Sequence, residues 1–207
     1  MEGGWHRKFP ALWPEPRKTF EPKLWRYEDV KPILDAAGRL VGEDQADRRN
    51  LTMFNPAPGN IYPTVRTIVA AYQMIRPSET ALAHRHTPNA LRLILEGRGA
   101  FTVVNGARVE MRPGDVLLTP SWAWHSHDNE GDGDCYWMDF LDVPLVHLLE
   151  PMFFERHPDG LEPNPVTVDS APIAFRWEET LDRLASEPAD ATPEATASIE
   201  LGSPALP

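Results

Sequence analysis

Short apolar runs that end in Gly, Pro or Asn fill the middle of the chain, from about residue 65 to residue 141. The runs are VRTIVAAYQMIRP (65–77), RLILEG (92–97), GAFTVVNG (99–106), ARVEMRP (107–113), DVLLTP (115–120) and CYWMDF (135–140). Runs of this length between turn residues are typical of β-strands. Asn105 and Gly106 predict a type I′ hairpin, because both residues tolerate a positive φ. Many short, evenly spaced strands favour a closed sandwich or barrel.

The regions on either side have helical or irregular patterns. YEDVKPILDAAGRL (27–40), LVHLLEPMFFERH (145–157) and FRWEETLDRLASE (175–187) place apolar residues at helical spacing, so each predicts a helix. We therefore expect four segments: an N-terminal arm with one helix (1–55), the barrel (56–144), a helical extension (145–186) and an extended or disordered tail (187–207).

Two details of the end segments carry expectations of their own. Trp5, Trp13 and Trp25 are scattered through the arm. Isolated tryptophans would otherwise expose much apolar area, so the arm should lie on a larger body. In the tail, the short run 199–201 (IEL) can add a strand to a neighbouring sheet.

Composition limits the function classes. The 207 residues have room for one substantial core, and 42% hydrophobic with 25% charged residues are ordinary for a globular protein. No apolar run approaches the roughly 20 residues that cross a bilayer, and the N-terminus lacks the apolar core of a signal peptide. Together with the single cysteine, Cys135, this predicts a cytoplasmic protein. A net charge of −11 disfavours nucleic acid and anionic membranes as partners, although one local positive pocket can still bind a small anion.

Two histidine pairs supply the candidate chemistry. His84 and His86 are two residues apart, and so are His125 and His127. In a strand, this spacing places both side chains on one face, close enough to share a metal ion. A single pair often lies near a strand end without any metal. Two pairs beside apolar runs favour a nitrogen-rich site for Fe(II), Cu(II), Ni(II) or Zn(II) rather than Ca²⁺ or Mg²⁺.

Arg92 lies inside the apolar run LRLILEG, where an unpaired guanidinium would be costly. A carboxylate bound through two parallel hydrogen bonds is its best geometrical partner. That carboxylate belongs either to a bound small acid or to Glu96, Glu110 or another internal acid. Trp122 and Trp124 should pack around the histidine that follows them, or form a wall for an aromatic ligand.

Two blocks carry a family resemblance: HRHTPNALRLILEGRG (84–99) and GDVLLTPSWAWHSHDN (114–129) resemble the two sequence motifs of the cupin superfamily. With ADRRNLTMFNP (46–56) and YWMDFLDVPLV (136–146), residues 25–154 are similar to the N-terminal cupin of gentisate 1,2-dioxygenases and their salicylate and 1-hydroxy-2-naphthoate relatives. The resemblance implies a mainly β fold, a single cupin barrel of the jelly-roll or double-stranded β-helix type, with an N-terminal arm and helix and with C-terminal helices.

The resemblance also implies a metal and a reaction. Fe(II) would be held by His84, His86 and His125, and O₂ would open an aromatic ring that carries a carboxylate next to a hydroxyl. Arg92 would bind the substrate carboxylate. His127 would accept a proton from the substrate hydroxyl or orient it, unless it is simply a solvent-exposed histidine of the following loop. Gln73 matches a pocket position of the relatives, and Arg48 is a weaker match.

Two positions depart from common patterns. Many cupins have a glutamate where this chain has Ala90, so the resemblance implies three neutral imidazoles, which leave a bound ion its full +2 charge. An anionic chelate such as a 2-hydroxybenzoate is then favoured. Four residues before Gln73 the relatives commonly have tryptophan, and Val69 at this position leaves the ring specificity open.

The relatives usually have two cupin domains, and this chain is expected to end about where the second would begin. Residues 171–187 resemble the linker helix, and residues 199–207 resemble the start of the second half. Oligomerisation can recover lost burial, so we expect a homo-oligomer.

Two functions of different class follow. The first is an Fe(II)-dependent ring-cleaving dioxygenase that acts on gentisate or a related aromatic acid in aromatic compound degradation. The alternative is a non-catalytic metal-binding cupin that binds a small acid, is regulatory, or is a remnant of a two-cupin enzyme. A zinc or nickel isomerase would use the same histidines but gives no reason for the surroundings of Arg92.

Overall fold

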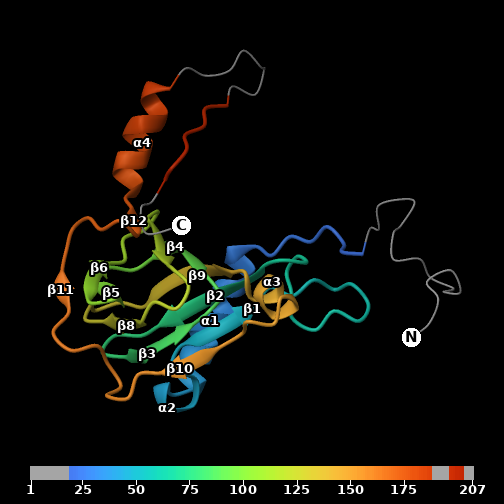
Figure 1. Cartoon of the computed structure of the whole chain (residues 1–207), viewed down its shortest axis with the longest axis horizontal. Coiled ribbons are helices and arrows are strands. Elements are labelled where there is room, and N and C mark those ends of the chain that lie inside the picture. The colour runs from blue at the N-terminus through green and yellow to red at the C-terminus, as the bar shows by residue number, and fades with distance from the viewer. Residues whose placement is uncertain (1–18, 188–195, 203–207) are drawn as a thin grey trace, which may run out of the picture.

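Two six-stranded sheets packed face to face form the body of the molecule (Figure 1). The computed structural model describes residues 19–187 and 196–202. In spatial order, the first sheet is β1 (Arg49–Thr52), β2 (Val69–Ile75), β9 (Cys135–Leu141), β4 (Ala90–Glu96), β7 (Val116–Thr119) and β12 (Ala174–Phe175). The second is β10 (Phe154–Arg156), β3 (Thr80–His86), β8 (His125–Asn129), β5 (Ala100–Val104), β6 (Ala107–Glu110) and β11 (Val166–Thr167). This arrangement confirms the mainly β double-sheet barrel.

Each of the six apolar runs forms a strand, and the predicted hairpin is present. β5 and β6 pair antiparallel, with Val104 opposite Ala107. Asn105 has a φ of 46° and Gly106 a φ of 80°. Both turn residues therefore adopt the left-handed conformation that a type I′ turn requires.

The main core lies between the sheets. Ile94, Leu117 and Trp137 of the first sheet pack with Val104 and Val109 of the second, and all five side chains are buried. Alternation along each strand turns these residues inward and leaves their neighbours on the outer faces. Burial of this apolar surface is the main stabilising contribution to the fold.

Helix α1 (Tyr27–Leu40) covers the outer face of the first sheet near β1 and β2 (Figure 1). Its Leu34 is fully buried against Tyr72, Met74 and Tyr136, which form a second apolar cluster with it. The helix has the predicted bounds. Trp25 packs against the same cluster, as expected for the arm.

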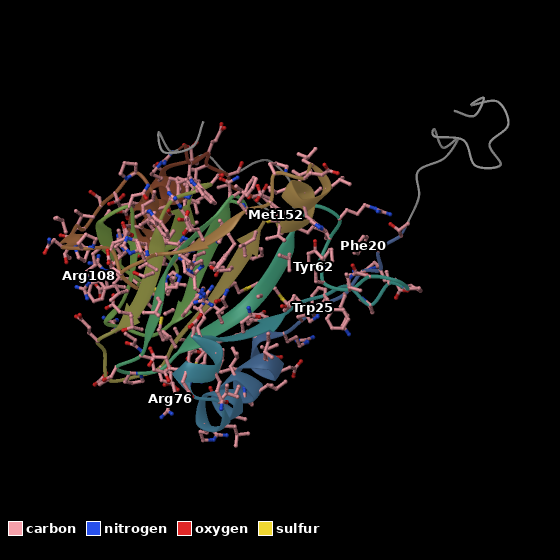
Figure 2. The ribbon with its side chains drawn as sticks, turned by 60° about the horizontal axis from the view of Figure 1, so that its bottom comes forward. Phe20, Trp25, Tyr62, Arg76, Arg108 and Met152 are labelled. Atoms are coloured by element: carbon pink, nitrogen blue, oxygen red, sulfur yellow. The ribbon has the colours of Figure 1, made fainter. Side chains whose placement is uncertain are left out.

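The short helix α2 (Glu43–Ala46) follows α1 and leads into β1. Arg76, just after β2, lies close to these helices (Figure 2) and donates a hydrogen bond to the carbonyl oxygen of Gly38 at 3.1 Å. Residues 43–52 thus form regular structure within the stretch that the sequence assigns to the arm.

The C-terminal region differs in part from the expected helices. α4 (Trp177–Ser186) is confirmed, but α3 ends early (Val143–Leu148). A helix through residues 145–157 is wrong for its second half, where Phe154–Arg156 is strand β10. Pro151 disfavours helical geometry in the residue before it, and Glu150 has a φ of 74°. The chain then pairs with the free edge of β3, so long-range hydrogen bonding overrides the local periodicity.

Several expectations concern the ends of the chain. Trp5, Trp13 and most of the predicted tail lie outside the described residues. Residues 199–201 are described and form no strand. In the part of the chain that the structure describes, every helix is too short or too polar to cross a membrane.

Candidate metal centre

Three histidines lie close together on β3 and β8, two neighbouring strands of the second sheet. β3 carries His84 and His86, and β8 begins with His125, directly opposite His84 in the antiparallel register. One potential ligand atom from each of the three side chains lies within 4.8 Å of the other two, a grouping that could hold one metal ion. The spacing of two residues on β3 brings His84 and His86 to the same face, as predicted.

The hydrogen bonds of the three rings leave matching nitrogens for a metal. The Nδ1 atoms of His84, His86 and His125 face the backbone carbonyl oxygens of Leu82, Pro88 and Ala123 at 3.1, 2.8 and 3.1 Å. A carbonyl only accepts hydrogen bonds, so each Nδ1 must carry the proton and donate it. Each Nε2 then keeps its lone pair for a metal. Carbonyl partners of this kind fix the tautomer and ring orientation of metal-ligating histidines.

Burial keeps these imidazoles neutral. It lowers the pKa of His84 to about 4, with a smaller lowering effect of the Arg48 charge. Burial likewise lowers the pKa of His86, and it lowers that of His125 to well below its ordinary value. A metal ligand must be deprotonated, so the three side chains are in the state that binding requires at neutral pH.

His127 is the fourth histidine of the two motifs and is fully buried, not solvent-exposed. Its ring centre lies 6.1 Å from that of His125 and 5.5 Å from that of Trp137. Neither ring nitrogen has a hydrogen-bond partner among the described residues. Burial, and after it the charge of Arg92, lowers the pKa of His127 well below its ordinary value. A buried imidazole with two unpartnered nitrogens is costly, which points to a partner outside the protein.

A cavity of about 210 Å³ adjoins the histidine cluster. It lies below the roughly 300–1,000 Å³ of pockets for drug-sized molecules and so favours a smaller ligand. The lining residues are Arg48, Asn50, Thr52, Val69, Ala71, Gln73, His86, Ala90, Arg92, His125, Asp139 and Leu141. The cavity therefore contains each of the three predicted substrate-binding residues and both positions at which the sequence departs from common patterns.

Arg92 is buried and paired with an internal acid. Its Nε lies 2.8 Å from Oδ1 of Asp139, and an Nη atom donates to Oδ2 at 3.2 Å. The second Nη atom donates to the hydroxyl of Thr102 at 3.4 Å. The internal acid foreseen as an alternative is therefore present, although Glu96 and Glu110 are not its source.

Arg48 has fewer side-chain partners than Arg92. Its Nε donates to Oε1 of Gln73 at 2.5 Å, and the amide of Gln73 donates to Oδ2 of Asp139 at 2.5 Å. Among the described residues, the two terminal nitrogens of Arg48 have no hydrogen-bond acceptor. Arg48 and Arg92 thus present two positive charges to the cavity, with one carboxylate, that of Asp139, between them.

Asp139 was not identified from the sequence as a site residue. It stands in the apolar run CYWMDF and is opposite Arg92 in the pairing of β4 with β9. Charged side chains are seldom fully buried without a partner. An acid in one buried strand and an arginine in another therefore indicate an ion pair between the two side chains. Which strands are neighbours, however, could not be read from local patterns.

The two tryptophans of the second motif, two further histidines and the single cysteine lie outside the cavity. Trp122 and Trp124 line no part of it and instead pack on either side of Arg85. His147 is exposed near the hydroxyl of Tyr62, and His157 packs against Trp124. Cys135 is a buried free cysteine of the core, and burial raises the pKa of its thiol to about 12, so it is an inert apolar residue.

Comparison with known proteins agrees with this geometry. Residues 71–143 match the family model described as "Cupin domain". The chain is 44% identical over 155 residues to 5-aminosalicylate 1,2-dioxygenase of Comamonas sp. The aligned region covers 73% of this chain and 41% of that protein. The chain is 39% identical over 159 residues to gentisate 1,2-dioxygenase of Ralstonia sp, covering 72% and 44%. The chain thus spans less than half the length of these two relatives.

A solved structure extends the match to nearly the whole chain. Salicylate 1,2-dioxygenase from Pseudaminobacter salicylatoxidans superposes with a TM-score of 0.83 at 31% identity, over 99% of this chain and 66% of that one. A structure of the same enzyme with gentisate adducts gives a TM-score of 0.78 at 31% identity, over 87% and 58%. The chain therefore belongs to the cupin superfamily and, within it, is a relative of the gentisate and salicylate 1,2-dioxygenases.

Proposed function

We propose that this chain binds Fe(II) through His84, His86 and His125 and catalyses O₂-dependent ring cleavage of gentisate or a related 2-hydroxy aromatic carboxylate. The observation that carries the proposal is a cluster of three imidazoles that could share one metal ion, two of which, His86 and His125, line one small cavity together with Arg48 and Arg92. The names of the relatives support the substrate class, and one structural neighbour was solved with gentisate adducts.

The donor set fits a divalent transition metal. All three nitrogens are neutral, and Ala90 lines the cavity where a carboxylate ligand is expected in many cupins. A bound ion therefore keeps its +2 charge, which favours an anionic ligand with two oxygens. When bound, Fe(II) supplies the redox chemistry that ring opening by O₂ requires and that Zn²⁺ lacks.

The substrate carboxylate is proposed to bind between Arg48 and Arg92. Arg92 already uses two nitrogens on Asp139, so it contributes mainly its charge and its fixed position. Arg48 has terminal nitrogens available for a bidentate hydrogen bond, and Gln73 holds its Nε in place. The arrangement orients the acid at the moment of binding without a rearrangement of the protein.

His127 is proposed to accept the proton of the substrate hydroxyl or to orient that hydroxyl. Its two unpartnered nitrogens and its neutral state support this role. Val69, Ala71, Ala90 and Leu141 supply the apolar wall for the ring. Exclusion of water by this wall strengthens the interaction of the two arginines with an anion.

Anaerobic loading with Fe(II) followed by addition of air-saturated buffer tests the proposal. Oxygen uptake and ultraviolet absorption of a ring-opened product should be detected with at least one of gentisate, salicylate and 1-hydroxy-2-naphthoate. His84→Ala should lose both iron and uptake. His147→Ala, which changes an exposed histidine outside the cavity, should lose neither and is the matched control.

Stoichiometric iron without oxygen uptake on any of the three acids would overturn the dioxygenase and favour the non-catalytic metal-binding cupin. Iron that persists in His84→Ala would instead show that the ligand assignment is wrong. The two failures are distinct, because iron content and oxygen uptake are measured separately.

A further inference from the structure

A guanidinium held between two indole rings lies directly behind the histidine cluster. The Cζ atom of Arg85 is 4.4 Å from the ring centre of Trp122 and 4.3 Å from that of Trp124. Along its edge, Nε and one Nη atom of Arg85 both donate to Oε2 of Glu155, at 2.8 and 2.5 Å. Two indole rings and one carboxylate therefore contact the guanidinium, and 26% of the Arg85 side chain remains exposed.

The position of Arg85 in the chain connects this stack to the proposed ligands. Arg85 stands between His84 and His86 on β3, so its side chain leaves the strand on the face opposite to theirs. Trp122 and Trp124 belong to the segment that leads into His125, the first residue of β8. The stack therefore joins the strand that carries two ligands to the segment that carries the third.

The backbone of this segment needs such support. Trp122 has a φ of 63°, which is unusual for a bulky residue, and its N–H donates to the carbonyl oxygen of His86 at 2.8 Å. Glu155 belongs to β10 and is opposite Arg85 in the pairing with β3. Three segments, 84–86, 122–125 and 154–156, thus meet at one guanidinium.

We propose that Arg85 is a positioning residue for the three-histidine centre, which it serves by fixing the Trp122–His125 segment against strand β3 without touching the metal itself. The proposal rests on the metal centre of the proposed function but not on the ring-cleavage reaction. A planar guanidinium suits the role, because it stacks on two rings while its edge binds a carboxylate. A lysine ammonium cannot do both.

Titration of the metal-free chain with Co(II) provides the test, with absorption spectra that report on the ligand geometry. Arg85→Met should weaken Co(II) binding about ten-fold and change the ligand-field bands, as losses of outer contacts around metal ligands do. Arg85→Lys should lie between Arg85→Met and the unaltered chain. Arg112→Met, which removes exposed pairs with Glu110 and Asp169, is the matched control and should bind Co(II) normally.

Trp124→Leu should weaken binding as Arg85→Met does, and the double variant should lose little more, because both changes break the same stack. Melting temperatures of the metal-free variants separate this role from a general effect on folding. A lowered melting temperature with unchanged Co(II) affinity and spectrum in Arg85→Met and Arg85→Lys would overturn the positioning role. Failure of the unaltered chain to bind Co(II) or Fe(II) would overturn the metal centre itself.

Discussion

Asp139 determines which nitrogens of Arg92 and Arg48 remain available to a ligand in the cavity. It occupies Arg92 with both carboxylate oxygens and also accepts a hydrogen bond from Gln73, which in turn holds Arg48. The sequence identifies Arg92 as a residue that needs a carboxylate, but it cannot decide whether that carboxylate is internal or bound. Tertiary pairing of β4 with β9 decides it, because this pairing places Arg92 opposite Asp139.

Substitutions at the two arginines should therefore have different effects. Arg92→Met leaves Asp139 buried without its ion-pair partner and should lower the free energy of unfolding by roughly 3 kcal/mol. Adding Asp139→Asn should restore part of that loss. Arg48→Met should leave stability nearly unchanged but weaken binding of gentisate or salicylate. Chemical denaturation and ligand titration measure the two effects, and equal stability losses in the two single variants would contradict the assignment.

Helix α1 shows how a correctly predicted element still depends on distant partners. The apolar spacing of residues 27–40 predicts the helix with its bounds, but not the sheet face on which it lies. Leu34 packs into the cluster of Tyr72 and Met74, and the hydroxyl of Tyr136 donates to Asp35 at 2.5 Å. For strand β10 the local pattern predicts the wrong element, because hydrogen bonds to the edge of β3 override the helical spacing of its residues.

The contact between Asp35 and Tyr136 should make the docking of α1 sensitive to acid. The Tyr136 hydroxyl hydrogen bond lowers the pKa of Asp35 below its ordinary value of 3.8. The unfolded chain then takes up this proton at a higher pH than the folded chain does. The stabilising contribution is therefore complete above pH 3.8 and is lost as the pH falls through the lower folded pKa.

Asp35→Asn should cost about 1 kcal/mol at pH 7 and flatten the acid limb of the stability curve below pH 4. Tyr136→Phe, which removes the hydroxyl donor and keeps the carboxylate, should give a similar profile. Denaturant unfolding between pH 3 and pH 7 measures both. An acid limb as steep as that of the unaltered chain would show that the contact does not stabilise the folded state.

At the scale of the whole molecule, the metal centre links the chain's chemistry to its stability. The three imidazoles come from β3 and β8, so an ion bound by them bridges two strands that are far apart in the sequence. The unfolded chain has no preformed site, and metal binding therefore favours the folded state. The predicted homo-oligomer and cytoplasmic location concern the same scale and stay predictions.

Co(II) or Fe(II) at 100 times its dissociation constant should raise the free energy of unfolding by about 2.7 kcal/mol and increase the melting temperature accordingly. His125→Ala should abolish this shift. His147→Ala, which changes an exposed histidine outside the cluster, should retain it. Anaerobic thermal scans with and without metal provide the measurement, and a full shift in His125→Ala would contradict the ligand set.

The sequence by itself determined the strands formed by the six apolar runs, the Asn105–Gly106 hairpin and the shared face of His84 and His86, because these depend on local spacing and on turn geometry. Its family resemblance supplied the expected third ligand, His125. Only the tertiary structure decided that Arg92 faces Asp139, that residues 154–156 form a strand, and that Arg85 lies between Trp122 and Trp124. These contacts join segments distant in sequence, and pairing between strands, not local periodicity, brings such segments together.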